Sequence, residues 1–167
     1  MFSGKVIRNL LLNMIIKVSQ IYNATKGTKQ DFDLEFKAED FADLPFKGAI
    51  KAEGYIMRVQ EGVMMMIEKL DAVQVAECVR CGKTLNRKID FTPQEWLFYE
   101  QKPLLEDDEN EHLVMDKTRI EIDPYEPIRQ ELVLNMDNAP RCAKLCKTFK
   151  DPEPGIKALS GLKDLVK

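Results

Sequence analysis

Asp31-Phe32-Asp33-Leu34-Glu35-Phe36 alternates strictly between acidic and apolar side chains. Successive side chains of a strand point to opposite faces of a sheet, so this stretch predicts a β-strand with one buried face. Residues 49–59 are also strand-like and contain Gly54, which predicts a β-bulge. Glu61-Gly62 then predicts a turn. These segments favour a sheet built from short-range connections.

Two further regions carry conflicting local signals. Residues 63–67 and 73–76 are strand-like, but the methionines at 64–66 leave a helix as an alternative. We interpret these methionines as filling the core rather than contacting a cofactor. Near Trp96, Thr92-Pro93-Gln94-Glu95 is typical of a helix start, whereas the flanking aromatic and β-branched residues suit a strand. Both interpretations remain open at this point.

The strongest helix signal spans Pro124–Met136. Asp123 can cap the helix, Pro124 occupies its first position, and Glu126 completes a capping box. A second short helix is expected over residues 156–166. The sequence therefore predicts an α+β fold of mainly antiparallel strands, as a curled sheet or partial barrel, with one or two packed helices. The apolar face of the first helix comprises Tyr125, Ile128, Leu132 and Met136.

The composition is that of one folded domain: 167 residues, 44% hydrophobic and 32% charged, with a net charge of −3. No run approaches the roughly 18–20 apolar residues of a membrane span. Residues 1–13 are interpreted as a dispensable extension, followed by a single domain over 14–167 that begins with a strand at Ile15–Ser19. Since the first thirty residues are basic and free of acids, an organellar transit peptide is the alternative to a cytoplasmic location.

Residues that could support catalysis are scarce. His112, the only histidine, lies in the acidic stretch 106–112, which we interpret as a solvated surface loop. The chain contains no phosphate-binding loop, dinucleotide fingerprint or serine elbow. We therefore expect that the protein is not an enzyme.

All four cysteines fall in two close pairs, Cys78-Val79-Arg80-Cys81 and Cys142-Ala143-Lys144-Leu145-Cys146. Zinc prefers a tetrahedron of four thiolates, which two short loops can supply, and Gly82 permits the turn that the first pair requires. We predict one structural zinc ion held by Cys78, Cys81, Cys142 and Cys146. Four thiolates leave no open position for catalysis. The alternatives are a thiol redox protein that uses Cys78 and Cys81, or a zinc adaptor module of another complex.

Basic residues flank both cysteine pairs. One ion joining the pairs would gather them into a surface suited to a phosphate backbone or an acidic partner. The candidate nucleic-acid-binding residues are Arg80, Lys83, Arg87, Lys88, Arg141, Lys144, Lys147 and Lys150.

Several of these segments resemble one known family in matching order. Cys78-Val79-Arg80-Cys81 is similar to the Cys-x-Arg-Cys motif of the YceD family, the large ribosomal RNA subunit accumulation proteins. The segments 15–19 and 31–36 resemble the opening strands of that family. The segment 120–123 leading into 128–134 resembles its acidic-then-helical segment, and 151–163 resembles its C-terminal tail. The resemblance implies a role in large-subunit ribosome assembly, with ribosomal RNA or a large-subunit ribosomal protein as partner. It implies no catalytic residue, and it favours a strand at Trp96.

Overall fold

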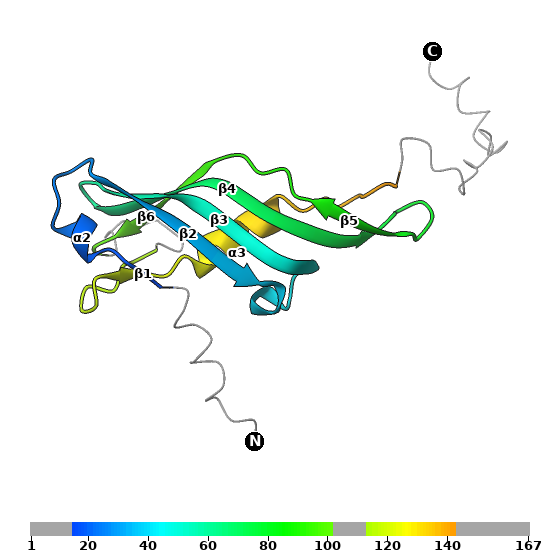
Figure 1. Ribbon diagram of the computed structural model, residues 1–167, viewed down its shortest axis with the longest axis horizontal. Helices are drawn as coiled ribbons and strands as arrows, with labels where there is room; N and C mark the ends of the chain where they lie inside the picture. The colour runs from blue at the N-terminus through cyan, green and yellow to red at the C-terminus, as the bar shows by residue number, and fades with distance from the viewer. Residues whose placement is uncertain (1–14, 102–112, 143–167) are drawn as a thin grey trace, which may run out of the picture.

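The computed structural model describes residues 15–101 and 113–142 (Figure 1). The expectations for residues 1–13, for the acidic loop with His112, and for a helix over 156–166 lie outside these residues.

One antiparallel sheet of five strands forms most of the described structure. The order is β2-β3-β4-β5, and β6 also pairs with β4. Strand β6 pairs with residues 62–67 of β4 and β5 with residues 73–77, so both lie on the edge of β4 opposite β3. The strands are β2 (Lys29–Lys37), β3 (Phe46–Arg58), β4 (Gly62–Glu77), β5 (Thr84–Lys88) and β6 (Gln94–Tyr99).

The predicted strands are confirmed in this sheet. The alternating stretch 31–36 lies in β2, and the register between β3 and β4 shifts at Gly54, where the bulge was expected. A Cβ atom at Gly54 would overlap the carbonyl oxygen of Met66, so only glycine fits this close approach of the two strands. The expected turn connects β3 to β4, where Val59 N–H donates to the Gly62 carbonyl at 3.1 Å.

Two helical alternatives are wrong. Residues 63–67 and 73–76 belong to one continuous strand, β4, because β3 pairs along one edge and β5 and β6 along the other. Trp96 lies in β6, opposite Met65 of β4, and its indole N–H donates to Glu131 Oε1 at 3.1 Å. Pairing with β4 therefore outweighs the helix-start signal at Thr92–Glu95.

The remaining elements are short. The expected strand at Ile15–Ser19 is limited to β1 (Ile16–Lys17), because Ser19 already begins a single-turn helix in which Tyr22 N–H donates to the Val18 carbonyl. Strand β1 pairs with β7. These elements are α2 (Ser19–Tyr22), the 3-10 helix η2 (Ala38–Phe41), β7 (Glu121–Ile122) and α3 (Tyr125–Leu134).

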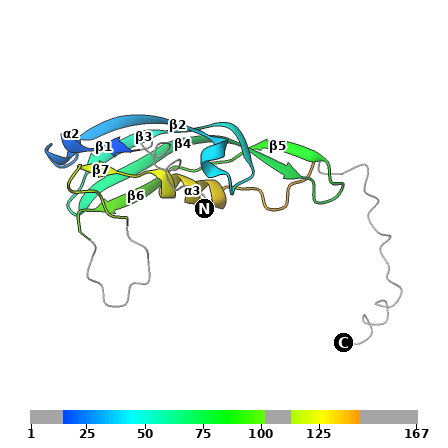
Figure 2. The ribbon, with the colours of Figure 1, turned by 90° about the horizontal axis from the view of Figure 1, so that it is seen from below.

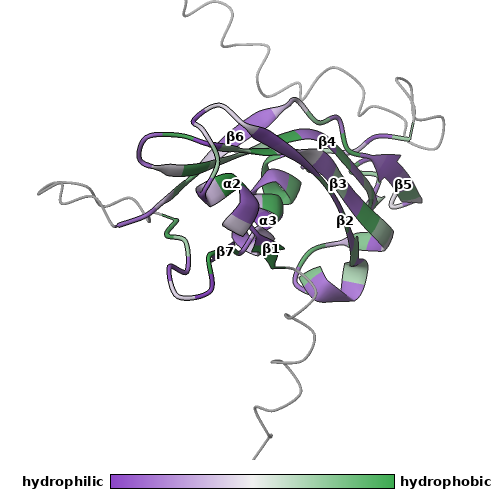
Figure 3. Ribbon diagram, turned by 60° about the vertical axis from the view of Figure 1, so that its left-hand side comes forward, coloured by the Kyte–Doolittle hydropathy of each residue, from purple (hydrophilic) through white to green (hydrophobic). Residues whose placement is uncertain are grey.

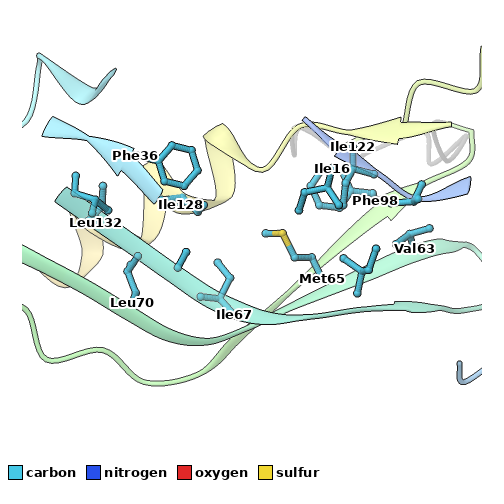
Figure 4. Close-up of a cluster of buried hydrophobic side chains, with 14 of the residues drawn as sticks. Ile16, Phe36, Val63, Met65, Ile67, Leu70, Phe98, Ile122, Ile128 and Leu132 are labelled. Atoms are coloured by element: carbon cyan, nitrogen blue, oxygen red, sulfur yellow. The ribbon is translucent and has the colours of Figure 1, made fainter. Parts of the chain in front are cut away.

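Helix α3 lies against the concave face of the curved sheet, together with β1 and β7 (Figures 2 and 3). It begins one residue later and ends two residues earlier than expected. Asp123 Oδ1 accepts from Tyr125 N–H at 2.9 Å, whereas Glu126 accepts from Gln130. Ile128 and Leu132 are fully buried among the apolar side chains of the sheet (Figure 4).

The α+β class with mainly antiparallel strands is confirmed, but the sheet is curled and open rather than closed into a barrel. Within the described residues, β2 at one edge pairs only with β3. The concave face is filled instead by α3 and by the β1–β7 pair, which complete the core without closure.

Candidate metal centre

The first cysteine pair lies in the turn that joins β4 to β5, at the end of the sheet beside the chain segment 137–142 (Figure 1). Cys78 N–H donates to the Lys83 carbonyl and Gly82 N–H to the Cys78 carbonyl, both at 2.9 Å. Gly82 has φ +71°, a left-handed conformation that glycine adopts without steric cost. The turn therefore folds back on itself, as the spacing of Cys78 and Cys81 predicts.

Three of the four predicted ligands lie together. The Sγ atoms of Cys78, Cys81 and Cys142 are all within 4.8 Å of one another, and those of Cys81 and Cys142 are 3.8 Å apart. Zinc–sulfur bonds of about 2.3 Å in a tetrahedron place neighbouring sulfurs about 3.8 Å apart. The three thiols are therefore close enough together to hold a metal ion, and the separation of Cys81 and Cys142 equals that of neighbouring ligands in a tetrahedron. Cys146 lies outside the described residues.

The environment of Cys78 favours its thiolate. Its side chain is 2% exposed, and Cys142 N–H donates to its Sγ at 3.4 Å. That hydrogen bond, with others from the backbone of Arg80 and Cys81, lowers the pKa of Cys78 to about 6, although burial opposes the shift. The thiolate is the form that binds metals and the form that acts as a nucleophile.

Hydrogen bonds from Gln74, Val79 and Arg87, together called the clamp, hold the segment that carries Cys142. Gln74, which is 5% exposed, donates from Nε2 to the Asp137 carbonyl at 3.2 Å and accepts from Asp137 N–H at 2.9 Å. Val79 N–H donates to the Pro140 carbonyl at 2.9 Å. The guanidinium of Arg87 binds the carboxylate of Asp137 at 3.3 Å and also donates to the Arg141 carbonyl. These contacts bring Cys142 to the first pair across more than sixty residues of sequence.

Gln74 and Asp137 were not predicted from the sequence. The available signal was the position of Gln74, a polar residue on the face of β4 that also carries the buried Leu70 and Ala72. A buried amide needs hydrogen-bond partners, so such a residue indicates a polar contact with another segment.

The predicted basic residues occupy different surroundings. Arg87 lies opposite the buried Gln74 and faces the segment 137–141, whereas Lys88 lies opposite Val73 on the other face of the sheet. Lys83 and Arg141 are exposed beside the cysteines, and Arg80 lies within the turn. Lys144, Lys147 and Lys150 lie outside the described residues.

Comparison with protein-family models matches residues 68–161 to the family described as large ribosomal RNA subunit accumulation protein YceD. The match covers more than half of the chain and all four cysteines. The chain belongs to the YceD family. This confirms the resemblance, and the description associates the family with accumulation of the large ribosomal RNA. Searches of the curated proteins and of the solved structures found no match.

The matched region of this YceD-family chain contains the second half of β4, the cysteine turn, β5, β6 and α3. It therefore includes both sides of the cysteine cluster and the clamp at Gln74. Within the residues that the structure describes, no helix is long and apolar enough to cross a membrane.

Proposed function

We propose that this chain is a ribosome-assembly factor, formed by one domain over residues 14–167, that supports large-subunit ribosomal RNA accumulation and is stabilised by a structural zinc ion. The supporting observation is the convergence of three thiols, from two distant parts of the sequence, within 4.8 Å of one another. Zinc suits an all-thiolate site, and Cys146, four positions after Cys142, is the proposed fourth ligand.

The proposed ion ties the β4–β5 turn to the segment that follows α3. The hydrogen bonds of Gln74, Val79 and Arg87 already hold that segment beside the turn. Metal–sulfur bonds would therefore strengthen an existing contact between the two segments. Four thiolates would leave the ion no position for water or substrate, which makes the role structural. Metal analysis of the purified protein tests this proposal: one zinc per chain supports it, and a metal-free protein with four reactive thiols contradicts it.

The basic side chains beside the cysteines are the proposed RNA-binding surface. Arg80 and Lys83 belong to the cysteine turn and Arg141 precedes Cys142, so the metal would hold all three near one another. Arg87 contributes less to this surface, because its guanidinium is engaged by Asp137 and by the Arg141 carbonyl. Contacts to phosphate weaken as salt rises, which distinguishes them from protein–protein contacts of apolar character.

A charge-reversal experiment tests this surface. We expect the double variant Arg80→Glu and Lys83→Glu to bind large-subunit ribosomal RNA at least about tenfold more weakly in filter binding, with a shallower salt dependence. Lys26→Glu with Lys117→Glu makes the same charge change at two exposed residues outside the cysteine turn and serves as control. Equal affinity of the double variant and the wild type would remove the surface from the proposal.

The cellular role is tested separately. Depletion of the protein is expected to lower the level of large-subunit ribosomal RNA relative to the small-subunit RNA. Unchanged RNA levels together with normal subunit profiles would contradict the role in assembly, whatever the metal content.

A thiol redox function is the second candidate, because the lowered pKa of Cys78 also suits a nucleophilic thiol. Cys81 lies within the same turn and could act as the resolving thiol. Disulfide reductase activity of the purified protein would favour this function. Bound zinc with thiols that react only after chelation would exclude it.

A further inference from the structure

Apolar side chains gather on the convex face of the sheet near the β3–β4 turn. Met66 of β4 lies opposite Tyr55 of β3, and Met64 lies between Met57 of β3 and Leu97 of β6. All five are half-buried, while the residues between them in each strand point to the opposite face. We refer to Tyr55, Met57, Met64, Met66 and Leu97 as the methionine patch.

The same face is charged farther along the strands. Lys51 pairs with Glu35 at 3.2 Å, and Lys69 pairs with Glu53 at 3.2 Å and Asp71 at 3.0 Å. The ordinary alternation of buried apolar and exposed polar residues therefore holds there but not at the methionine patch. Helix α3, β1 and β7 all lie on the concave side (Figures 2 and 3), so none of these described elements covers the patch.

Carboxylates border the methionine patch on the side of β6. A hollow of about 250 Å³ beside Met64 and Leu97 is also lined by Glu61 and Glu95, both exposed, and by no lysine or arginine. An adjoining hollow of about 330 Å³ shares Glu61 and adds Tyr99 and Glu100, but the carboxylate of Glu100 pairs with Arg58 at 2.6 Å. At the opposite border, Lys29 lies 3.7 Å from the ring centroid of Tyr55. The hollow beside Met64 therefore has apolar walls and a negatively charged border.

We propose that the methionine patch and its acidic border dock a basic segment of a protein partner that inserts an apolar side chain into the hollow beside Met64. Methionine side chains are flexible and polarizable, and they adapt to apolar side chains of different shape. Glu61 and Glu95 attract lysine or arginine of that segment and repel the phosphates of a nucleic acid. This surface is separate from the cysteine turn and does not depend on the function proposed for it.

The probe is a synthetic peptide of repeated Leu-Lys, compared by fluorescence anisotropy with a repeated Leu-Glu peptide. The Leu-Lys peptide is expected to bind the full-length protein saturably and the Leu-Glu peptide not to bind. Glu61→Lys with Glu95→Lys should weaken the binding about tenfold or more. Glu39→Lys with Asp90→Lys reverses two exposed acids outside the patch and its border and should leave the affinity within about twofold.

Met64→Gln with Leu97→Gln tests the apolar part and is expected to weaken the same peptide about tenfold. Since Glu61 and Glu95 are exposed, their reversal does not disturb the core, and the charge test stands even where the glutamine variant unfolds. Equal binding of both peptides, or equal losses in the border and control variants, would overturn the proposal. Single-stranded RNA that binds, and loses affinity with Met64→Gln and Leu97→Gln, would overturn it in favour of a nucleic-acid surface.

Discussion

Gln74 is expected to control metal affinity although it touches no cysteine. Its amide makes two hydrogen bonds with the backbone of Asp137, five residues before Cys142. Gln74→Leu keeps a similar volume but removes both bonds. The N–H and carbonyl of Asp137 must then find other partners, and the segment that carries Cys142 loses its main attachment to β4.

The magnitude follows from the two lost bonds. Each contributes roughly 0.5–1.5 kcal/mol, so the variant should lose about 2 kcal/mol of the free energy of unfolding. If that entire loss falls on the ordering of the segment 137–142, metal binding weakens by about thirtyfold, since 1.4 kcal/mol corresponds to a factor of ten. A smaller loss of affinity would mean that Val79 and Arg87, which also bind this segment, retain part of the arrangement.

Zinc affinity is measured by competition with a chromogenic chelator, and stability by urea denaturation of the metal-free protein. Gln130→Leu is the matched control, because among the described residues the Gln130 side chain makes one hydrogen bond, to Glu126 on α3, and none to the segment 137–142. It should change neither quantity by more than about 0.5 kcal/mol. Wild-type zinc affinity and stability in Gln74→Leu would refute the reasoning.

Three further predictions follow from particular contacts. Gly54→Ala should lower the urea-unfolding free energy by about 1–3 kcal/mol, because the new methyl group overlaps the carbonyl oxygen of Met66; wild-type stability would contradict this. Burial raises the pKa of Glu131, so the wild type should lose stability as pH rises from the ordinary value of 4.5 through the raised pKa. Glu131→Gln should therefore gain stability relative to wild type on going from below pH 4.5 to neutral pH, and a difference that stays constant over this range would exclude the effect. In metal-free protein, diamide should join Cys81 to Cys142, whose sulfurs are 3.8 Å apart, and peptide mass mapping should find this bond absent from the zinc-loaded protein.

The strand pattern could be predicted because it depends on neighbouring residues. The alternation at 31–36 and the glycine at 54 indicate faces and a bulge without knowledge of the partner strand. The Trp96 region could not be decided in this way. Its state depends on pairing with Met65 and on the bond to Glu131, both more than thirty residues distant in sequence.

Each cysteine pair could be recognised because its spacing is a local property. The convergence of the pairs was inferred from the preference of zinc for four thiolates, and three of the cysteines lie together as expected. The clamp at Gln74 was missed, since a single polar residue in an apolar strand does not identify its partner. A cluster of basic residues in the sequence does not show which side of the sheet each side chain occupies. Arg87 and Lys88 are adjacent in sequence but lie on opposite faces of β5. Sequence alone therefore predicted the grouping of these three cysteines better than the surface around them.

Among the strands that the structure describes, β2 lies at an edge of the open sheet, to which another extended chain could add. Every second residue of β2 is charged and exposed to solvent; these residues are Lys29, Asp31, Asp33, Glu35 and Lys37. A second copy aligned antiparallel on this edge would place the three central acids beside one another, which repels the incoming strand. The triple variant Asp31→Asn, Asp33→Asn and Glu35→Gln would remove that repulsion, so its self-association should begin at β2.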